Sequence, residues 1–394
     1  MREHLTRGRS SNRSRGNEIR SGCCSSRILG KFRADRFSQP TCTEEHIHEY
    51  PGAGRGPSRA THARALAIEA RELVKTYPKE IRALDGPSFT VEEGTVFGLL
   101  GPNGAGKSTT VKILTTLAQA DSGPASVAGL DVRTQAAAVR RAIGVVAQPS
   151  GADPTATGRE NLLLSGRIQG LRGRELGRRA DELLARFDLA SAAGRMVRTY
   201  SGGMQRRLDV AMGLIHRPEV LFLDEPTAGL DPESRSAMWD EIARLSAGEG
   251  LTILLTTHYL EEADRLASQL AIVERGRVVA AGSPDDLKAR LHGDTVHVEL
   301  ALPGDPAELD AVLRQVPAVR EVSVTGTELS ARADDGATTV PALLSALERA
   351  GIGVHGITAA RPSLDDVYLR YAGRGFAQAE QPAPPAPTPS GGTR

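Results

Sequence analysis

Residues 94–109 read GTVFGLLGPNGAGKST. Residues 94–101 form a short apolar run bounded by glycines, which is typical of a strand buried in a parallel sheet. Gly101 to Ser108 follow with the spacing G-x-x-x-x-G-K-S, and a helical pattern runs from Lys107 to about Leu117. A strand, a glycine-rich turn and a helix in this order predict a loop whose backbone N–H groups bind phosphate.

The residue types of this loop fit phosphate chemistry. Glycines let N–H groups reach phosphate oxygens without side-chain obstruction. Lys107 supplies a positive charge for β- and γ-phosphates, and the Ser108 hydroxyl can bind Mg²⁺. The predicted nucleotide-binding residues are Gly101, Pro102, Asn103, Gly104, Ala105, Gly106, Lys107, Ser108 and Thr109.

Two carboxylates follow a second apolar run, Val220–Leu223. In a parallel sheet, ligands lie beyond the carboxyl ends of the strands. Asp224 can therefore hold Mg²⁺ through water, and Glu225 can polarise the water that attacks the γ-phosphate. A solvent-facing Asp-Glu pair is the alternative interpretation, and the phosphate loop in the same chain disfavours it.

A second helix start with the features of an anion site lies at Tyr200-Ser201-Gly202-Gly203-Met204. Apolar residues then recur at helical spacing through Leu208 and Ile215. Ser201 and the glycines expose N–H donors at the start of this predicted helix. An ordinary Ser N-cap explains the same residues without any function.

Further buried strands are predicted at Ile143–Ala147, Ile253–Thr256 and Leu270–Val273, and helical patterns separate them. The fold class is therefore α/β with a mainly parallel sheet. Residues 153–199 are polar, Arg-rich and helical, which indicates an insertion between two strands. After residue 293 the predicted order β-α-β-β-α-β indicates a small α+β, ferredoxin-like unit.

The complete set of motifs resembles the ATP-binding subunits of ABC transporters. The residues that carry the resemblance are GPNGAGKST, YSGGM where the family usually has LSGGQ, LFLDEPTAGLDP, Gln148 and His258. Their order and spacing agree with the family over about residues 67–290. The resemblance implies a P-loop NTPase fold with an antiparallel β subdomain and a helical insertion, and ATP and Mg²⁺ as cofactors.

The family resemblance also implies roles for single residues. Gln148 would contact Mg²⁺ or the attacking water, and His258 would bind the γ-phosphate, so both join Glu225 as catalytic residues. Tyr77 would stack on adenine. Ser201, Gly202 and Gly203 would close on ATP held by the opposite subunit, and Asp231 would communicate across the dimer. The metal ligands would be Ser108, Gln148 and Asp224.

The C-terminal residues narrow the resemblance. The stretch PSLDDVYL, residues 362–369, is similar to the ending of daunorubicin-resistance-type subunits, and Ser363 with Asp366 also forms a local helix-start signal. That group implies a drug exporter in which a homodimer of this chain binds a separate membrane subunit. The chain would then lie peripherally at the cytoplasmic side of the cell membrane, with no nucleic acid as a partner.

Composition supports a multi-part chain. Its 394 residues hold 49 Lys+Arg against 48 Asp+Glu, but residues 1–64 alone hold 13 against 6. The predicted parts are a disordered basic leader (1–66), an ABC ATPase domain (67–292), a C-terminal regulatory or dimerisation domain (293–372) and a proline-rich tail (373–394). No apolar run reaches the ~18–20 residues that a membrane span needs.

Several alternatives stay open at this point. A soluble ABC-type ATPase that acts on ribosomes or DNA is the competing function, and the basic leader is its main support. The leader can also bind anionic lipid or have no role. Its cysteines (Cys23, Cys24 and Cys42), with His46 and His48, match no standard zinc spacing. The transported compound is not predicted, because the membrane subunit contacts it.

Overall fold

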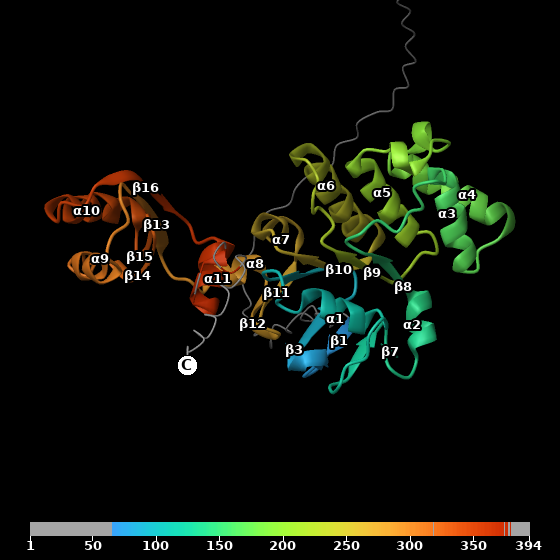
Figure 1. Cartoon of the computed structure of the whole chain (residues 1–394), viewed down its shortest axis with the longest axis horizontal. Coiled ribbons are helices and arrows are strands. Elements are labelled where there is room, and N and C mark those ends of the chain that lie inside the picture. Colours follow the sequence, from blue (N-terminus) through green and yellow to red (C-terminus); the bar gives the residue numbers. More distant parts are fainter. Residues whose placement is uncertain (1–64, 318, 374, 377–378, 380–394) are drawn as a thin grey trace, which may run out of the picture. The chain divides into compact units, whose positions relative to one another are not determined.

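The computed structural model describes residues 65–317, 319–373, 375–376 and 379 (Figure 1). Residues 1–64 of the predicted leader, with its cysteines and His46 and His48, and most of the predicted tail lie outside the described residues, whereas Leu66 at the predicted end of the leader already starts β1. Six strands form the central sheet in the order β12-β11-β5-β10-β9-β8. They are β5 (Val96–Leu100), β8 (Ile143–Val146), β9 (Val220–Asp224), β10 (Thr252–Thr257), β11 (Gln269–Glu274) and β12 (Arg277–Gly282).

Five strands of this sheet are parallel, and β12 pairs antiparallel with β11 at one edge. Every residue of β5 and of β10 is buried, as expected for strands covered on both faces. The helices that cover the sheet include α1 (Lys107–Leu114), α5 (Gly202–Gly213), α6 (Pro232–Glu249) and α7 (Leu260–Leu266).

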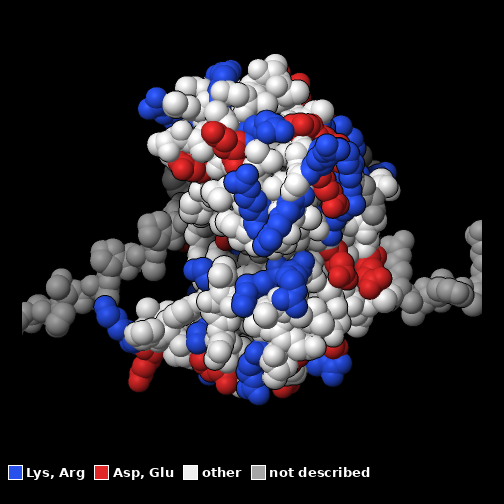
Figure 2. Space-filling view, turned by 90° about the vertical axis from the view of Figure 1, so that its right-hand side faces the viewer, with Lys and Arg blue, Asp and Glu red and all other residues white. Residues whose placement is uncertain are grey.

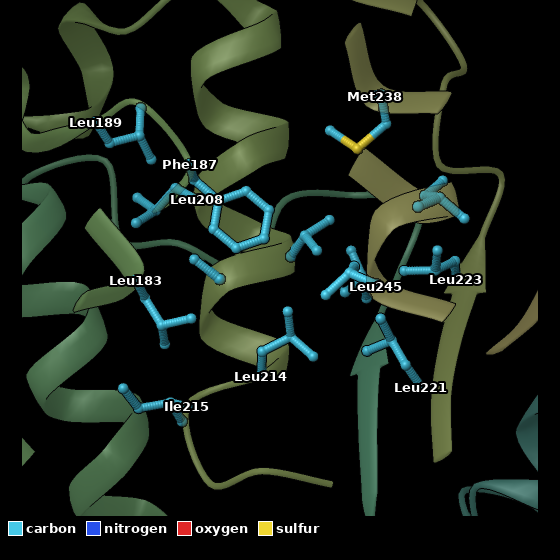
Figure 3. Packing of buried hydrophobic residues seen from close by; sticks show 14 of the residues in the cluster. Leu183, Phe187, Leu189, Leu208, Leu214, Ile215, Leu221, Leu223, Met238 and Leu245 are labelled. Atoms are coloured by element: carbon cyan, nitrogen blue, oxygen red, sulfur yellow. The ribbon is translucent and has the colours of Figure 1, made fainter. Parts of the chain in front are cut away.

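Side chains of β9 alternate between two hydrophobic cores. Leu221 and Leu223 pack with residues of α5 and α6, and Figure 3 shows this core around Leu208, Leu245 and Phe187. Val220 and Phe222 point the other way and pack with residues of α1. Helices α5 and α1 therefore cover opposite faces of the same sheet.

A second, antiparallel sheet completes the core around α1. Its order is β4-β1-β6-β7, with β1 (Leu66–Ala70), β4 (Phe89–Glu92), β6 (Ala125–Val127) and β7 (Leu130–Asp131). Phe89 of this sheet stacks on Phe97 of the central sheet at a ring distance of 5.3 Å. A separate hairpin joins β2 (Val74–Tyr77) through η1 (Pro78–Glu80) to β3 (Ile81–Asp85).

Helices fill the chain between β8 and β9, as the sequence predicts. They are α3 (Gly158–Ile168), α4 (Gly173–Arg186), the short η2 (Ala190–Ala192) and η3 (Val197–Thr199), and α5. A capping box between Thr157 and Glu160 starts α3. Leu183 of α4 and Phe187 after it are buried against Leu208 of α5 (Figure 3).

The C-terminal part has the predicted β-α-β-β-α-β order. After α8 (Pro284–Ala289) come β13 (Asp294–Leu300), α9 (Pro306–Leu313), β14 (Val319–Thr325), β15 (Glu328–Ala333), α10 (Gly336–Arg349) and β16 (Val354–Ala360). The sheet order β14-β15-β13-β16 is antiparallel throughout and is that of a ferredoxin-like unit. Leu309, Leu313, Leu343 and Leu347 on the two helices are buried with residues of the sheet.

Helix α11 (Leu364–Ala372), the last named helix among the described residues, packs against α7, α8 and β12. Ser363 and Asp366 form the predicted capping box at its start. Val367 and Tyr368 are fully buried in a cluster that includes Leu270 and Ile272 of β11. The Tyr368 hydroxyl donates a hydrogen bond to the buried Glu274 carboxylate. This helix therefore links the ferredoxin-like unit to the central sheet.

Two details differ from the sequence prediction. Helix α1 ends at Leu114, three residues before the predicted end, and Thr116 has a left-handed φ of 65° that no continuing helix allows. Helix α2 (Ala136–Ala142) and strands β2, β3, β6, β7 and β12 were not predicted, because they are short and lack a clear period. None of the described helices is both long enough and apolar enough to cross a membrane.

Tyr368→Phe tests the link made by α11. The substitution keeps the ring, which lies edge-on to Phe376, but removes the donor to Glu274. Loss of a hydrogen bond to a buried carboxylate should lower the free energy of unfolding by about 1–3 kcal/mol. Urea unfolding followed by the fluorescence of Trp239, the chain's single tryptophan, measures this value.

Tyr371→Phe on the same helix is the control, because Tyr371 is 39% exposed and should tolerate the change. Equal stability of the two variants would show that the Tyr368 hydroxyl does not stabilise the chain.

Candidate active site

The phosphate loop has a shape that two glycines make possible. It joins the end of β5 to the start of α1, where Gly106 has a φ of 111°. A methyl group on Gly106 would lie 2.7 Å from the carbonyl oxygen of Ala83, and one on Gly101 would lie 2.3 Å from that of Val273. No larger residue fits at either position without moving the backbone. The helix start that follows offers N–H groups without helical partners, which suits an anion.

Lys107 lies inside this loop. Its side chain is 4% exposed, and Nζ donates to the carbonyl oxygens of Gly101 (2.6 Å) and Pro102 (3.1 Å). Nζ also lies 3.8 Å from Glu225 Oε1. The ammonium group is therefore held between the loop and the carboxylate that follows β9, where it can bind phosphate oxygens.

The ends of β9 and β10 bring Asp224 to the same place. Ser108 Oγ donates to Asp224 Oδ1 at 3.4 Å, and Thr256 Oγ1 donates to the same oxygen at 2.5 Å. The backbone N–H of Glu225 donates to the Thr256 carbonyl oxygen at 3.1 Å. Because β9 and β10 are parallel neighbours, their carboxyl ends place these groups beside the phosphate loop.

Glu225 is the point at which the predicted catalytic residues meet. Gln148 Nε2 donates to Glu225 Oε2 at 3.1 Å. On the other side, His258 Nδ1 lies 3.2 Å from Oε1, without the alignment of a hydrogen bond. Glu225 also has a left-handed φ of 47°, a strained conformation for this residue type that is found at functional sites.

The charge state of Glu225 follows from these neighbours. His258 lowers the pKa of Glu225, partial burial opposes this, and Lys107 adds to the lowering. Glu225 is therefore ionised at neutral pH, and its oxygens can accept a hydrogen bond from a water molecule.

The predicted second anion site lies at the start of α5, beside the start of α6. Ser201 caps α5, and its Oγ accepts a hydrogen bond from the Met204 N–H at 3.3 Å. Asp231 caps α6 and accepts from the Ser234 N–H at 2.9 Å. A methyl group on Gly203 would lie 2.6 Å from Ser234 Oγ, so the two helix starts touch. The Ser201 N-cap, which was the alternative interpretation of these residues, is present in the structure. Ser201, Gly203 and Asp231 lie close together.

The remaining predicted residues lie around the phosphate loop. Pro102 and Ala105 are buried in it, Asn103 and Gly104 are exposed, and Thr109 is half-buried on α1. Gly202 follows Ser201 at the start of α5. Tyr77 ends β2 and pairs with Ile81 of β3, the strand whose Ala83 touches Gly106. Its ring lies 5.7 Å from Lys75 Nζ, and its role in adenine binding stays a prediction.

Sequence reasoning missed three polar residues of the site. Thr256 holds Asp224, as described above. Glu262 on α7 is fully buried and accepts hydrogen bonds from Thr227 Oγ1 (2.8 Å) and Trp239 Nε1 (3.1 Å), and burial raises its pKa. Arg206 on α5 is buried against main-chain carbonyl groups around Gln148 and Glu225. Only Thr256 had a sequence signal, since it directly precedes Thr257-His258.

Comparisons with known proteins agree with this geometry. The family described as "ABC transporter" matches residues 84–228, and "ATP-binding protein DrrA1-3-like, C-terminal domain" matches residues 282–372. The daunorubicin resistance ATP-binding protein DrrA2 of Streptomyces coeruleorubidus is 47% identical over 78% of this chain and 95% of its own length. The Nod factor export ATP-binding protein I of Sinorhizobium fredii is 39% identical over 86% and 95%.

Solved structures give the same answer for the fold. A dimeric, post-hydrolysis ATP-binding cassette bound to ADP and phosphate superposes with a TM-score of 0.51 at 25% identity, covering 55% of this chain and 98% of that chain. An ATP-binding subunit of an ABC transporter gives 0.52 at 29% identity, covering 57% and 92%. The ribosome- or DNA-directed alternative gains no support from these relatives. The chain belongs to the ATP-binding subunits of ABC transporters, in the daunorubicin-resistance group, and is the ATP-hydrolysing subunit of an exporter.

Proposed function

We propose that this chain hydrolyses ATP at Glu225 to drive export of a drug-like or other hydrophobic compound through a separate membrane subunit. The observation that carries the proposal is the convergence of Lys107, Gln148 and His258 on the Glu225 carboxylate. Relatives named for daunorubicin, linearmycin and Nod factor support the class of compound. The chain then acts peripherally at the cytoplasmic side of the cell membrane.

The proposed chemistry follows from the positions of five side chains. The loop N–H groups and Lys107 bind the β- and γ-phosphates and stabilise the charge that develops on them. Glu225 accepts a hydrogen bond from the attacking water and orients it. Gln148 holds the other Glu225 oxygen, and His258 reaches the γ-phosphate from the opposite side. Tyr77 stacks on the adenine ring.

The site also fits a magnesium ion. The Ser108 hydroxyl, the Asp224 carboxylate and the Gln148 amide are oxygen ligands of the kind that Mg²⁺ prefers. Among the described residues, no cluster of three or more His, Cys, Asp or Glu side chains offers another metal site. When bound, Mg²⁺ neutralises charge on the β- and γ-phosphates.

A homodimer completes the site. Helix α1, which starts at Lys107, and helix α5, which starts after Ser201, cover opposite faces of the sheet. Ser201 and Gly203 contact Met204 and Ser234 rather than the phosphate loop, and we propose that they do not close over the nucleotide of their own chain. In a head-to-tail pair these residues and Asp231 cover the nucleotide held by the partner. The ferredoxin-like unit, residues 293–372, is proposed to regulate or support this dimer.

A groove beside Gln148 is the proposed docking site for the membrane subunit. It has a volume of about 340 Å³ and is lined by Leu117, Arg140, Val145, Ala147 and Gln169, among others. Leu117 is 71% exposed and Val145 is 38% exposed, so this groove presents apolar surface. Figure 2 shows the side with α2, α3 and α4, across which basic side chains gather. An amphipathic helix of the membrane subunit fits this surface.

Glu225→Gln tests the catalytic assignment. Glutamine keeps the shape of the side chain but carries no negative charge to orient the water. The variant should therefore bind ATP and form a stable ATP-bound dimer, but lose steady-state ATPase activity by at least about 100-fold. Phosphate release, nucleotide binding and size-exclusion chromatography with ATP measure the three effects. Glu219→Gln, an exposed glutamate just before β9, is the control. Normal ATPase activity in Glu225→Gln would sink the assignment.

Mixing two inactive variants tests the shared site. Lys107→Ala damages the phosphate loop, and Ser201→Arg damages the covering segment. If the two act on one nucleotide from different chains, a mixed dimer holds one intact site and ATPase activity partly returns. If both acted within one chain, the mixture would remain as inactive as each variant alone.

Leu117→Glu tests the docking groove. A charge at the rim should prevent the apolar face of the amphipathic helix from docking. Co-purification with the membrane subunit should therefore fall, while ATP binding stays unchanged. Leu302→Glu is the matched control, because Leu302 is 76% exposed but lies in the ferredoxin-like unit. Equal co-purification of both variants would place the membrane subunit elsewhere.

A further inference from the structure

Two buried charged residues on α5 lie beside the site, but the chemistry proposed above gives them no role. Arg206 and Asp209, here called the α5 pair, are each 6% exposed. Burying a charge without partners costs a large amount of free energy, so buried charged groups normally have specific contacts. Both side chains point to the segment around Gln148, and Arg206 also reaches the end of β9.

Arg206 donates only to main-chain carbonyl groups in these contacts. Nη1 donates to Ala147 at 2.6 Å, the residue directly before Gln148. Nε donates to Pro226 at 2.8 Å, and Nη2 to Asp224 at 2.9 Å and Glu225 at 3.2 Å. One planar guanidinium group thus holds the three consecutive carbonyl groups around the strained Glu225 backbone.

Asp209 lies one turn further along α5 and contacts the other side of Gln148. Its Oδ1 accepts hydrogen bonds from Ser150 Oγ at 2.9 Å and from the Gly151 N–H at 3.0 Å. The α5 pair therefore fixes the backbone before and after Gln148. Between these two anchors the Gln148 side chain extends to Glu225.

We infer that the α5 pair is a positioning device, which ties the helix that follows Ser201 to both Gln148 and Glu225. The inference rests on the proposed function, since it gives Gln148 and Glu225 their catalytic roles. It adds that the position of α5 sets the distance between these two side chains. A change at Ser201 would then reach the hydrolytic glutamate of the same chain through one buried arginine.

A replacement for Arg206 would need several hydrogen-bond donors that reach carbonyl groups of two segments. Methionine at position 206 fills a similar volume but donates no hydrogen bond, so the four carbonyl contacts are lost. Lysine carries the charge on one nitrogen and cannot span carbonyl groups from two segments as a guanidinium fork does. Arg206→Lys should therefore restore only part of what Arg206→Met loses.

The test is a double-mutant cycle in the full chain. Arg206→Met should leave the ATP dissociation constant unchanged, because Lys107 and its loop are intact, and lower kcat by about ten- to a hundredfold. If Arg206 acts through Gln148, then Gln148→Ala should cost much less kcat in the Arg206→Met background than in the native chain. Urea unfolding of each variant reports stability separately.

Arg207→Met is the matched control on the same helix. Arg207 donates to the Phe187 carbonyl oxygen at 3.0 Å, inside the helical insertion and away from Gln148. In the double variant, the fold-losses in kcat caused by Arg207→Met and by Gln148→Ala should multiply. If the effects of Arg206→Met and Gln148→Ala multiply in the same way, the positioning role is wrong.

Two further outcomes keep the test decisive. If Arg206→Met does not fold, Asp209→Asn and Arg206→Lys replace it in the same cycle. If their losses in kcat multiply with that of Gln148→Ala, the inference is also overturned. Glu225→Gln distinguishes failure of the proposed function from failure of the α5 pair as a positioning device. Normal turnover in Glu225→Gln removes the proposed function, whereas loss of turnover there with full kcat in Arg206→Met removes only the role of the α5 pair.

Discussion

The contact between Lys107 and Glu225 depends on the order of three parallel strands. β5 delivers the phosphate loop with Lys107, β9 delivers Glu225, and β10 lies between them and delivers Thr256 and His258. Parallel strands end at the same edge of a sheet, so three segments far apart in the sequence place Lys107 and His258 within ion-pair distance of Glu225. Any change in strand order would separate the loop from the glutamate.

This arrangement explains why much of the site was predictable. The strands of the central sheet are apolar runs, and a polar residue directly after such a run must lie at the sheet edge. Asp224 and Glu225 carry that signal, Lys107 carries the spacing of the phosphate loop, and His258 was assigned through the family resemblance. Arg206 and Glu262 carry none, because a buried charge is recognised by what surrounds it, and carbonyl groups of distant segments leave no trace in the local sequence.

The C-terminal part also combines elements that the sequence predicts with contacts that only the structure reveals. The strand and helix pattern of residues 294–360 predicts a ferredoxin-like unit, and the structure has its sheet order. Ser363 and Asp366 predict the start of α11. An amphipathic helix, however, reveals only that one face is buried, and not which surface buries it. The packing of Tyr368 against Phe376 and Glu274 therefore required the structure.

The opposite placement of α1 and α5 has an energetic consequence. If one chain covered its own nucleotide, ATP would stabilise only that chain, and hydrolysis would change little outside it. In the proposed dimer Ser201 covers the partner's nucleotide, so the binding free energy of ATP would become free energy of dimerisation, and hydrolysis would remove it. The α5 pair would then have a function in that dimer, because the helix that starts beside the partner's ATP is the one that holds the backbone around Gln148 and Glu225. Closure of the proposed dimer and hydrolysis would thereby be joined within a single helix.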